Sequence, residues 1–286
     1  MISQIPDGLL RGDQVVPHLA RLLGADWESE EGPLCLATDL TAEEAGASSL
    51  FADAGLFLRL VGELGPVRLT QTGNLTRNFV AAFFKDMPMD HEMRVVYRVM
   101  NKVLNEMDVH PLHVARIVCT LAGLVAKRNR KLHLTRRGQA MLDAAESGTF
   151  YRRLFITFFR KLNLNYVYPM RDVPGIQHTL PLILLALGQA AREWADIDEL
   201  AGVVLPLPVL DDLRARMGPY EKEGWILAGY VLRPLEGFGL IQFRAGTREP
   251  KVGRIRQEVR LTPLWDRFLR FDLPPGVTAL LRASGW

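Results

Sequence analysis

The chain is poor in the features that mark secreted, disulfide-stabilised or membrane-spanning proteins. Its 286 residues include two cysteines, Cys35 and Cys119, which are too few for a disulfide framework and are expected to be small core residues. No run of about 18 uninterrupted apolar residues occurs, and the most apolar segment, 179–191, is broken by Pro181 and Gly188. The first residues lack the basic and apolar regions of a signal peptide. We therefore expect a cytoplasmic protein that does not use a membrane.

Motifs for catalysis, metal binding and cofactor binding are also missing. His110 and His113 are close in sequence, but no cysteine pair or acidic ligand stands at a zinc-site spacing from them. Gly237-Phe238-Gly239 lacks the third glycine of a dinucleotide loop, and no nucleophile elbow or kinase signature occurs. We therefore predict no catalytic residue, no metal site and no cofactor. A nuclease or other hydrolase would need carboxylates converging beside a basic surface.

The composition is that of a globular protein, with 48% hydrophobic and 23% charged residues. The net charge of +3 is unevenly distributed, because residues 1–65 carry −8, residues 66–170 carry +10 and residues 171–286 carry +1. A strongly basic middle third is typical of a surface that meets a polyanion. The alternative is that the acidic first part docks on the basic part of the same molecule.

A short pattern occurs three times, at Leu69-Thr70, Leu134-Thr135 and Leu261-Thr262. Each pair ends a short extended stretch and is followed by a turn and an amphipathic helix. The alternation before the threonine predicts a strand, and the threonine hydroxyl is suited to cap the next helix. The chain is thus expected to contain three related units.

Helical periodicity precedes each of these strands. Apolar spacing predicts helices over residues 51–64, 90–107, 112–126, 149–162 and 220–235. The second of these has a continuous apolar stripe made of Val96, Val99, Met100, Val103, Leu104 and Met107. Asn129 predicts a tight hairpin turn, and strands are expected at 237–243 and 255–261, with a Pro- and Gly-containing linker at 166–178.

Two helices, a two-stranded hairpin and a closing helix that starts at Leu134-Thr135-Arg136-Arg137-Gly138 resemble the winged-helix superfamily. The third unit departs from that pattern, with Pro263-Leu264-Trp265 where a glycine is expected. The resemblance implies a mainly α fold with small antiparallel β-hairpins, in tandem winged-helix-like units. We expect an acidic helical part with a degenerate unit at 1–85, a basic unit with an aromatic helix at 86–168, and a unit with a long wing at 169–286.

The middle unit carries the predicted nucleic-acid surface. In the winged-helix resemblance its second helix takes the recognition position, where a stripe of polar side chains would read base edges in a major groove. The following hairpin and helix start would hold phosphates. The predicted contact residues are His113, Arg116, Thr120, Lys127, Arg128, Arg130, Lys131, Arg136 and Arg137. The leading hypothesis is a non-enzymatic, regulatory protein that binds double-stranded DNA.

The alternative hypothesis is a protein–protein interaction or scaffold module that pairs with a second copy or with a partner protein. The helix of the last unit is mostly apolar, with Trp225, Ile226 and Tyr230 as the predicted interaction surface. The long wing of that unit also carries several cations that would add phosphate contacts. These are Arg244, Arg248, Lys251, Arg254 and Arg256.

Overall fold

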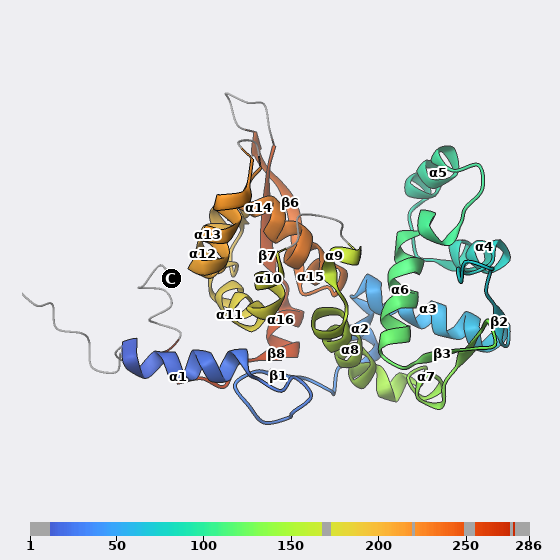
Figure 1. Cartoon of the computed structure of the whole chain (residues 1–286), viewed down its shortest axis with the longest axis horizontal. Coiled ribbons are helices and arrows are strands. Elements are labelled where there is room, and N and C mark those ends of the chain that lie inside the picture. Colours follow the sequence, from blue (N-terminus) through green and yellow to red (C-terminus); the bar gives the residue numbers. More distant parts are fainter. Residues whose placement is uncertain (1–11, 168–172, 219–220, 249–254, 275–276, 278–286) are drawn as a thin grey trace, which may run out of the picture. The chain divides into compact units, whose positions relative to one another are not determined.

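The computed structural model describes residues 12–167, 173–218, 221–248, 255–274 and 277. The chain divides into two compact units (Figure 1). Unit 1 contains residues 1–37 and 164–286, and unit 2 contains residues 38–163. Both are mainly helical with small antiparallel sheets, as predicted from the sequence.

Unit 2 is built from helices around a three-stranded sheet. Its elements are α2 (Ala42–Gly46), α3 (Ser49–Glu63), β2 (Val67–Arg68), α4 (Arg77–Asp86), α5 (His91–Met100), η1 (Glu106–Asp108), α6 (His110–Leu121), β3 (Val125–Arg128), β4 (Lys131–Leu134), α7 (Arg136–Ala140), η2 (Ala144–Glu146), α8 (Ser147–Ile156) and η3 (Thr157–Lys161). Within unit 2, α5 lies near the start of α6, whereas β3 follows its end (Figure 1).

The sheet of unit 2 has the antiparallel order β2–β4–β3. Because β2 pairs with β4, the stretch predicted as a degenerate first unit shares one sheet with the hairpin of the middle unit. The predicted boundary at residue 85 therefore differs from the observed division. The strand that pairs with β2 lies about 65 residues further along the chain, since Val67 is opposite Leu132.

The core of unit 2 forms where α3, α4, α6 and α8 face one another. Phe57 of α3 meets Phe79 of α4 edge to face at 5.9 Å between ring centroids. Val118 and Cys119 of α6 are fully buried in the same core. Cys119 is thus a core residue as expected, and burial raises the pKa of its thiol. This packing holds α6 and the hairpin in fixed positions.

Unit 1 has a similar arrangement. Its elements are α1 (Gly12–Leu23), β1 (Cys35–Leu36), α9 (Leu164–Val167), α10 (Pro174–His178), α11 (Leu180–Ala190), β5 (Ala195–Asp196), α12 (Ile197–Val204), α13 (Leu207–Arg216), α14 (Glu223–Leu227), η4 (Ala228–Leu232), α15 (Arg233–Gly237), β6 (Ile241–Arg248), β7 (Ile255–Leu261), α16 (Pro263–Phe268) and β8 (Leu269–Arg270). A three-stranded sheet has the order β5–β7–β6, and β1 pairs with β8.

The two units share their element order: a helix, a short strand, two helices, a third helix and a hairpin. In both, a glycine with positive φ stands two residues after the end of the helix that precedes the hairpin, Gly123 (φ 71°) after α6 and Gly239 (φ 73°) after α15. The following leucine donates its amide to the carbonyl five residues earlier. The hydroxyl of Thr135 bonds the carbonyl of Gly123, and that of Thr262 bonds the carbonyl of Gly239. The Leu-Thr pattern therefore marks the point where each hairpin is tied to its helix.

The main difference from the predicted helices is at residues 90–107, where α5 ends at Met100. Asp90 caps this helix, accepting the amide of Met93 at 2.7 Å. The helix predicted at 112–126 begins two residues earlier, at His110, and ends at Leu121 because Gly123 with its positive φ terminates it. Among the described helices, none combines the length and apolar character needed to cross a membrane.

Candidate nucleic-acid interface

The hairpin of unit 2 presents its cations to solvent. Asn129 and Arg130 both have left-handed backbone angles, with φ of 50° and 58°, and form the two-residue turn expected at Asn129. This turn pairs Arg128 with Lys131, and Lys131 is also opposite Arg68 of β2. Directly paired residues point to the same side of a sheet, so the three cations form one row across three strands. All of these side chains are exposed.

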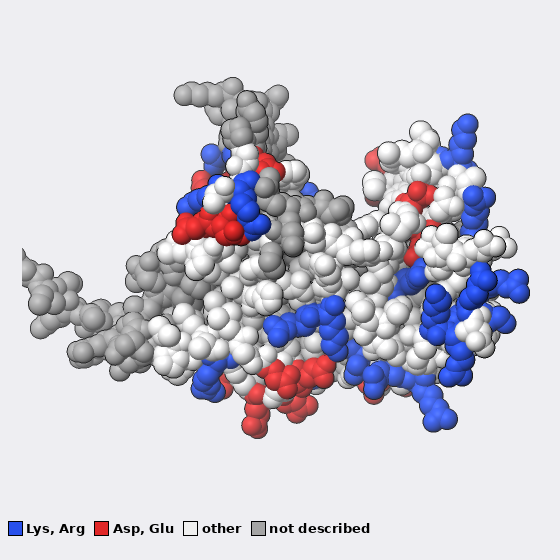
Figure 2. All heavy atoms as spheres, viewed as in Figure 1, with Lys and Arg blue, Asp and Glu red and all other residues white. Residues whose placement is uncertain are grey.

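This row is electrostatically unfavourable for the isolated fold. Like charges placed directly opposite one another in a sheet destabilise it. None of Arg68, Arg128, Arg130 and Lys131 forms an ion pair with any residue that the structure describes. Figure 2 shows Lys and Arg gathered on the side of unit 2 that carries the hairpin. The arrangement is suited to an anion from outside.

Arg136 and Arg137 extend the cationic surface beyond the hairpin. They occupy the first turn of α7, which Thr135 caps through the amide of Gly138, and both are exposed. Cations at a helix start gain nothing from the helix dipole, which favours anions there. Lys127 is exposed on β3, and its ammonium lies near the turn at Gly73. Six of the nine predicted contact residues are therefore exposed on the hairpin or at the start of α7, and the neighbouring strand β2 adds Arg68, which the sequence did not predict.

The other three predicted contact residues, on α6, do not form the expected outward stripe. His113 is 9% exposed, and its Nδ1 lies 3.1 Å from Oε1 of buried Glu106. The Arg116 guanidinium bonds Glu106 and, at 2.9 Å, the carbonyl of Gly73. The expectation that these side chains point outward is wrong for His113 and incomplete for Arg116, because a buried carboxylate draws both inward. Thr120 is exposed, but its hydroxyl donates to the carbonyl of Arg116 at 2.7 Å.

Glu106 is the centre of this internal network. Burial by itself raises a carboxyl pKa, but the hydrogen bond from His113, the amide of Leu75 at 2.7 Å and the charge of Arg116 together hold the pKa of Glu106 below its usual value. Leu75 belongs to the segment between β2 and α4. The ionised Glu106 therefore ties α6 to that segment, and the polar residues of α6 serve the fold.

A groove of about 480 Å³ between α4 and α5 forms a second basic region of unit 2. Arg94 is held in its wall, with its guanidinium bonded to the carbonyls of Phe84 and Met87 and lying 5.4 Å from the Phe84 ring. Lys85 and Arg98 also line the groove and are exposed. None of the described residues that line it is acidic. The groove lining comprises Arg77, Asn78, Ala81, Phe84, Lys85, Arg94, Arg98, Asn101, Lys102, Val103 and Leu104.

In the hairpin of unit 1, two of the cations form ion pairs with acidic residues. Arg244 pairs with Glu258 at 2.6 Å and lies 4.2 Å from the Trp194 ring. Arg256 pairs with Glu199 at 3.1 Å and approaches Asp196 at 3.7 Å. The side chains of Arg248, Lys251 and Arg254, also predicted as phosphate contacts, lie outside the described residues. Arg244 and Arg256 are therefore neutralised by carboxylates of their own unit, whereas Arg260 of β7 lies 4.8 Å from the Trp194 ring.

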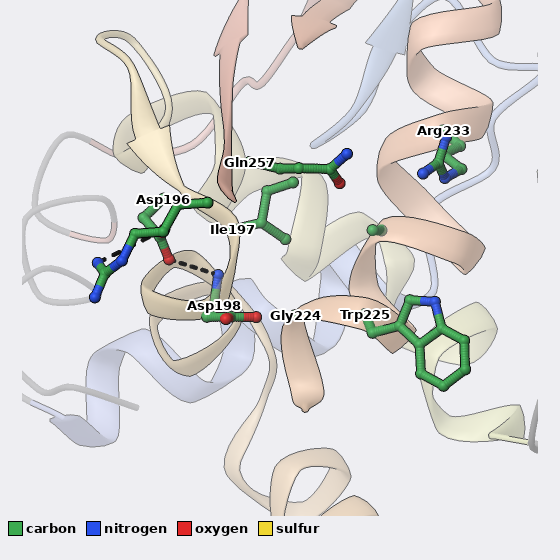
Figure 3. A pocket seen from close by; sticks show the side chains of 9 residues that line it. Asp196, Ile197, Asp198, Gly224, Trp225, Arg233 and Gln257 are labelled. Atoms are coloured by element: carbon green, nitrogen blue, oxygen red, sulfur yellow. Dashed lines mark hydrogen bonds and ion pairs between the residues drawn. The ribbon is translucent and has the colours of Figure 1, made fainter. Parts of the chain in front are cut away.

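The pocket beside these residues is small (Figure 3). Its volume of about 50 Å³ admits water rather than a substrate. Asp196 accepts the amides of Asp198 and Glu199 as the cap of α12, and Lys222 pairs with Asp198 at 2.8 Å. The carboxylates of Asp196 and Asp198 in this pocket therefore already have partners within the unit. Within the described residues, no three His, Cys, Asp or Glu side chains converge to hold a metal ion.

The predicted interaction surface of unit 1 is only partly exposed. Ile226 and Tyr230 are 1% and 3% exposed, and the Tyr230 hydroxyl donates to Asn165 at 2.9 Å. Trp225 is 58% exposed, and its indole points away from Asp196 and Asp198 (Figure 3). The apolar helix therefore mainly fills the core of its own unit, which explains its composition.

Comparison with known proteins covers part of unit 2. A family model described as the Y4jL N-terminal domain matches residues 46–147, which include α3, the hairpin and α7. No curated protein and no solved structure matches the chain. Residues 46–147 of this chain are thus similar to the Y4jL N-terminal domain.

Proposed function

We propose that the chain is a non-enzymatic DNA-binding protein with two winged-helix-like units, in which unit 2 makes the main contact. Support for this unit type comes from the shared element order and from the strand orders β2–β4–β3 and β5–β7–β6. The observation that carries the proposal is the row of Arg68, Lys131 and Arg128, exposed and without acidic partners among the described residues.

The contact is with the phosphate backbone. Lys127, Arg128, Arg130 and Lys131 anchor phosphates along the hairpin, and Arg136 and Arg137 continue the contact at α7. Because His113 is buried and Arg116 is bonded to Glu106, α6 offers few groups that read bases. Binding is therefore expected to depend weakly on sequence. Six neutralised phosphates correspond to a log–log salt slope of about −5.

The test is charge reversal on the hairpin. Arg128→Glu/Arg130→Glu/Lys131→Glu is expected to weaken binding to a random duplex by at least about 100-fold and to reduce the salt slope by about 3. Fluorescence anisotropy across a salt series measures both quantities. Circular dichroism and a thermal melt check that the variant folds, since the three side chains are exposed.

The matched control reverses three cations that already have acidic partners. Arg192, Arg214 and Arg216 pair with Asp266, Glu223 and Asp212 respectively. Arg192→Glu/Arg214→Glu/Arg216→Glu changes the net charge equally, yet it should weaken binding far less. Equal losses in the two triple variants would mean that only net charge matters, and the hairpin proposal would then fail.

A further inference from the structure

Helix α5 is packed with its polar side inward. The residues that face α4 are Arg94, bonded to two carbonyls, and Tyr97, whose ring lies 5.6 Å from that of Phe84. No residue of α5 is buried. Its apolar stripe faces solvent instead, with Val99 78% and Met100 77% exposed. The apolar stripe that the sequence analysis found in this helix is therefore uncovered in the described structure.

Other exposed apolar residues lie beside these two within α5 and in the segment that follows the helix. Met93, Val95, Val96, Val103 and Met107 are between 44% and 60% exposed. An isolated helix of about ten residues is marginal in water, because helices in proteins gain most of their stability by burying an apolar face. Contiguous apolar surface of this kind marks an interaction site. The stripe is thus suited to another protein surface.

We propose that the apolar stripe of α5 is an interface between two copies of this chain, whose α5 helices pair antiparallel about a two-fold axis. The charge distribution along the segment favours a second copy. Asp90 and Glu92 lie at its start, whereas Arg98 and Lys102 lie at its end, and all four are exposed. None of the four forms an ion pair with a described residue.

Antiparallel pairing matches these charges in both copies at once. An axis midway between Val96 and Val99 sets Val96 of each copy against Val99 of the other. Glu92, at the start of α5 in each copy, then lies towards the end of the partner's helix at Met100, which Lys102 follows two residues later, and the two helix dipoles oppose each other favourably. A two-fold interface must be self-complementary in this way, since the same patch serves both partners.

The location of α5 keeps this interface away from the hairpin. The helix lies near the start of α6, and the hairpin follows the end of α6 (Figure 1). A dimer formed through α5 therefore leaves both hairpins accessible. Dimer formation does not depend on the proposed DNA contact, because the mass of the protein is measured without nucleic acid.

The first experiment is sedimentation equilibrium of the full chain at micromolar concentrations. The wild type is expected to be a dimer, and Val99→Glu/Met100→Glu is expected to be a monomer with unchanged circular dichroism. The matched control, Val203→Glu/Leu207→Glu, alters two apolar residues of unit 1 that are 55% and 47% exposed, and it should remain dimeric. A monomeric wild type, or a dimer that tolerates the α5 substitutions, overturns the proposal.

A charge swap then tests whether the occupant is an antiparallel second copy. Glu92→Lys and Lys102→Glu are each expected to raise the dimer dissociation constant by roughly 10-fold. Each variant brings two like charges close together, and the two-fold axis repeats this contact in the other half of the interface. The double variant restores the opposite charges and should recover the wild-type dissociation constant. Single variants without effect, or a double variant as weak as the sum of the two, overturn the antiparallel arrangement.

Discussion

Unit 1 and unit 2 have the same order of elements but place their charges in opposite ways. Unit 2 buries two carboxyls, Asp53 and Glu106, and leaves the cations of its hairpin without acidic partners among the described residues. Unit 1 has no buried carboxyl among its described residues, and its hairpin cations Arg244 and Arg256 pair with acids. The number of basic residues on a hairpin is therefore a poor guide to binding, and their pairing is a better one.

The largest expected effect concerns Asp53, whose pKa is raised by burial from 3.8 to about 7. Between these values the unfolded chain releases a proton that the folded chain keeps. The free energy of unfolding should therefore fall as pH rises from 4 to 7, by up to about 4 kcal/mol. Asp53→Asn should remove this part of the pH dependence. Urea titrations of both proteins across that range measure it, and parallel curves would show that Asp53 is not responsible.

Glu106 is expected to change the stability with pH in the direction opposite to that of Asp53. Its lowered pKa contributes stability that is present at neutral pH and is lost as pH falls below its usual value of 4.5. Glu106→Gln should cost roughly 3 kcal/mol at pH 7, since it leaves Arg116 with an uncompensated charge. The control is Asp266→Asn in unit 1, which breaks the exposed Arg192 pair and should cost less than about 1 kcal/mol. Similar losses at both sites would contradict the contrast drawn between the units.

The glycine of the hairpin exit provides a third test. A Cβ on Gly138 would lie 2.1 Å from the Leu124 carbonyl oxygen, so Gly138→Ala should destabilise unit 2 by about 2 kcal/mol. The equivalent position of unit 1, three residues after the capping threonine, is Trp265, which packs near Gly188 of α11. Gly202→Ala, at an exposed helical site with no close neighbour, should instead add roughly 0.5 kcal/mol. Thermal melts that rank these two variants in the reverse order would contradict this account.

The smallest expected effect comes from freeing the cations of unit 1. Glu199→Gln/Glu258→Gln removes the Glu258 carboxylate from Arg244 and the Glu199 carboxylate from Arg256. We expect duplex affinity to rise roughly threefold at low salt, because newly available cations release more counterions. The control Glu30→Gln/Glu43→Gln gives the same change in net charge at exposed sites elsewhere. An equal increase in duplex affinity in the control would mean that ion pairing does not keep the cations of this hairpin from binding DNA.

Much of the fold follows from local sequence signals. Apolar periodicity predicted the presence of α3, α6 and α8, and Asn129 predicted the hairpin turn, because these features depend on neighbouring residues. The pairing of β2 with β4 was not predictable, since two strand residues separated by about 65 positions carry no local signal. The stripe of α5 was predicted as periodic, but periodicity does not state what covers a face.

The candidate site shows the same limit. Sequence reasoning found the hairpin cations, which are adjacent in the chain, but it missed Arg68, which joins them only through the sheet. It also assigned His113 and Arg116 to solvent, because the burial of Glu106 depends on the packing of α6 against the segment after β2. A helical stripe of polar residues can contact nucleic acid or bond a buried group of the same unit. Only the location of the Glu106 carboxylate in the structure distinguishes these two roles.

The two left-handed residues of the hairpin turn connect stability with function. Glycine is the residue best suited to the second position of such a turn, and an arginine held at φ 58° costs about 1 kcal/mol relative to it. If the DNA contact holds, Arg130 is a site where selection for binding has opposed selection for a stable fold. Arg130→Gly should then give a protein that melts at a higher temperature and binds a duplex less tightly.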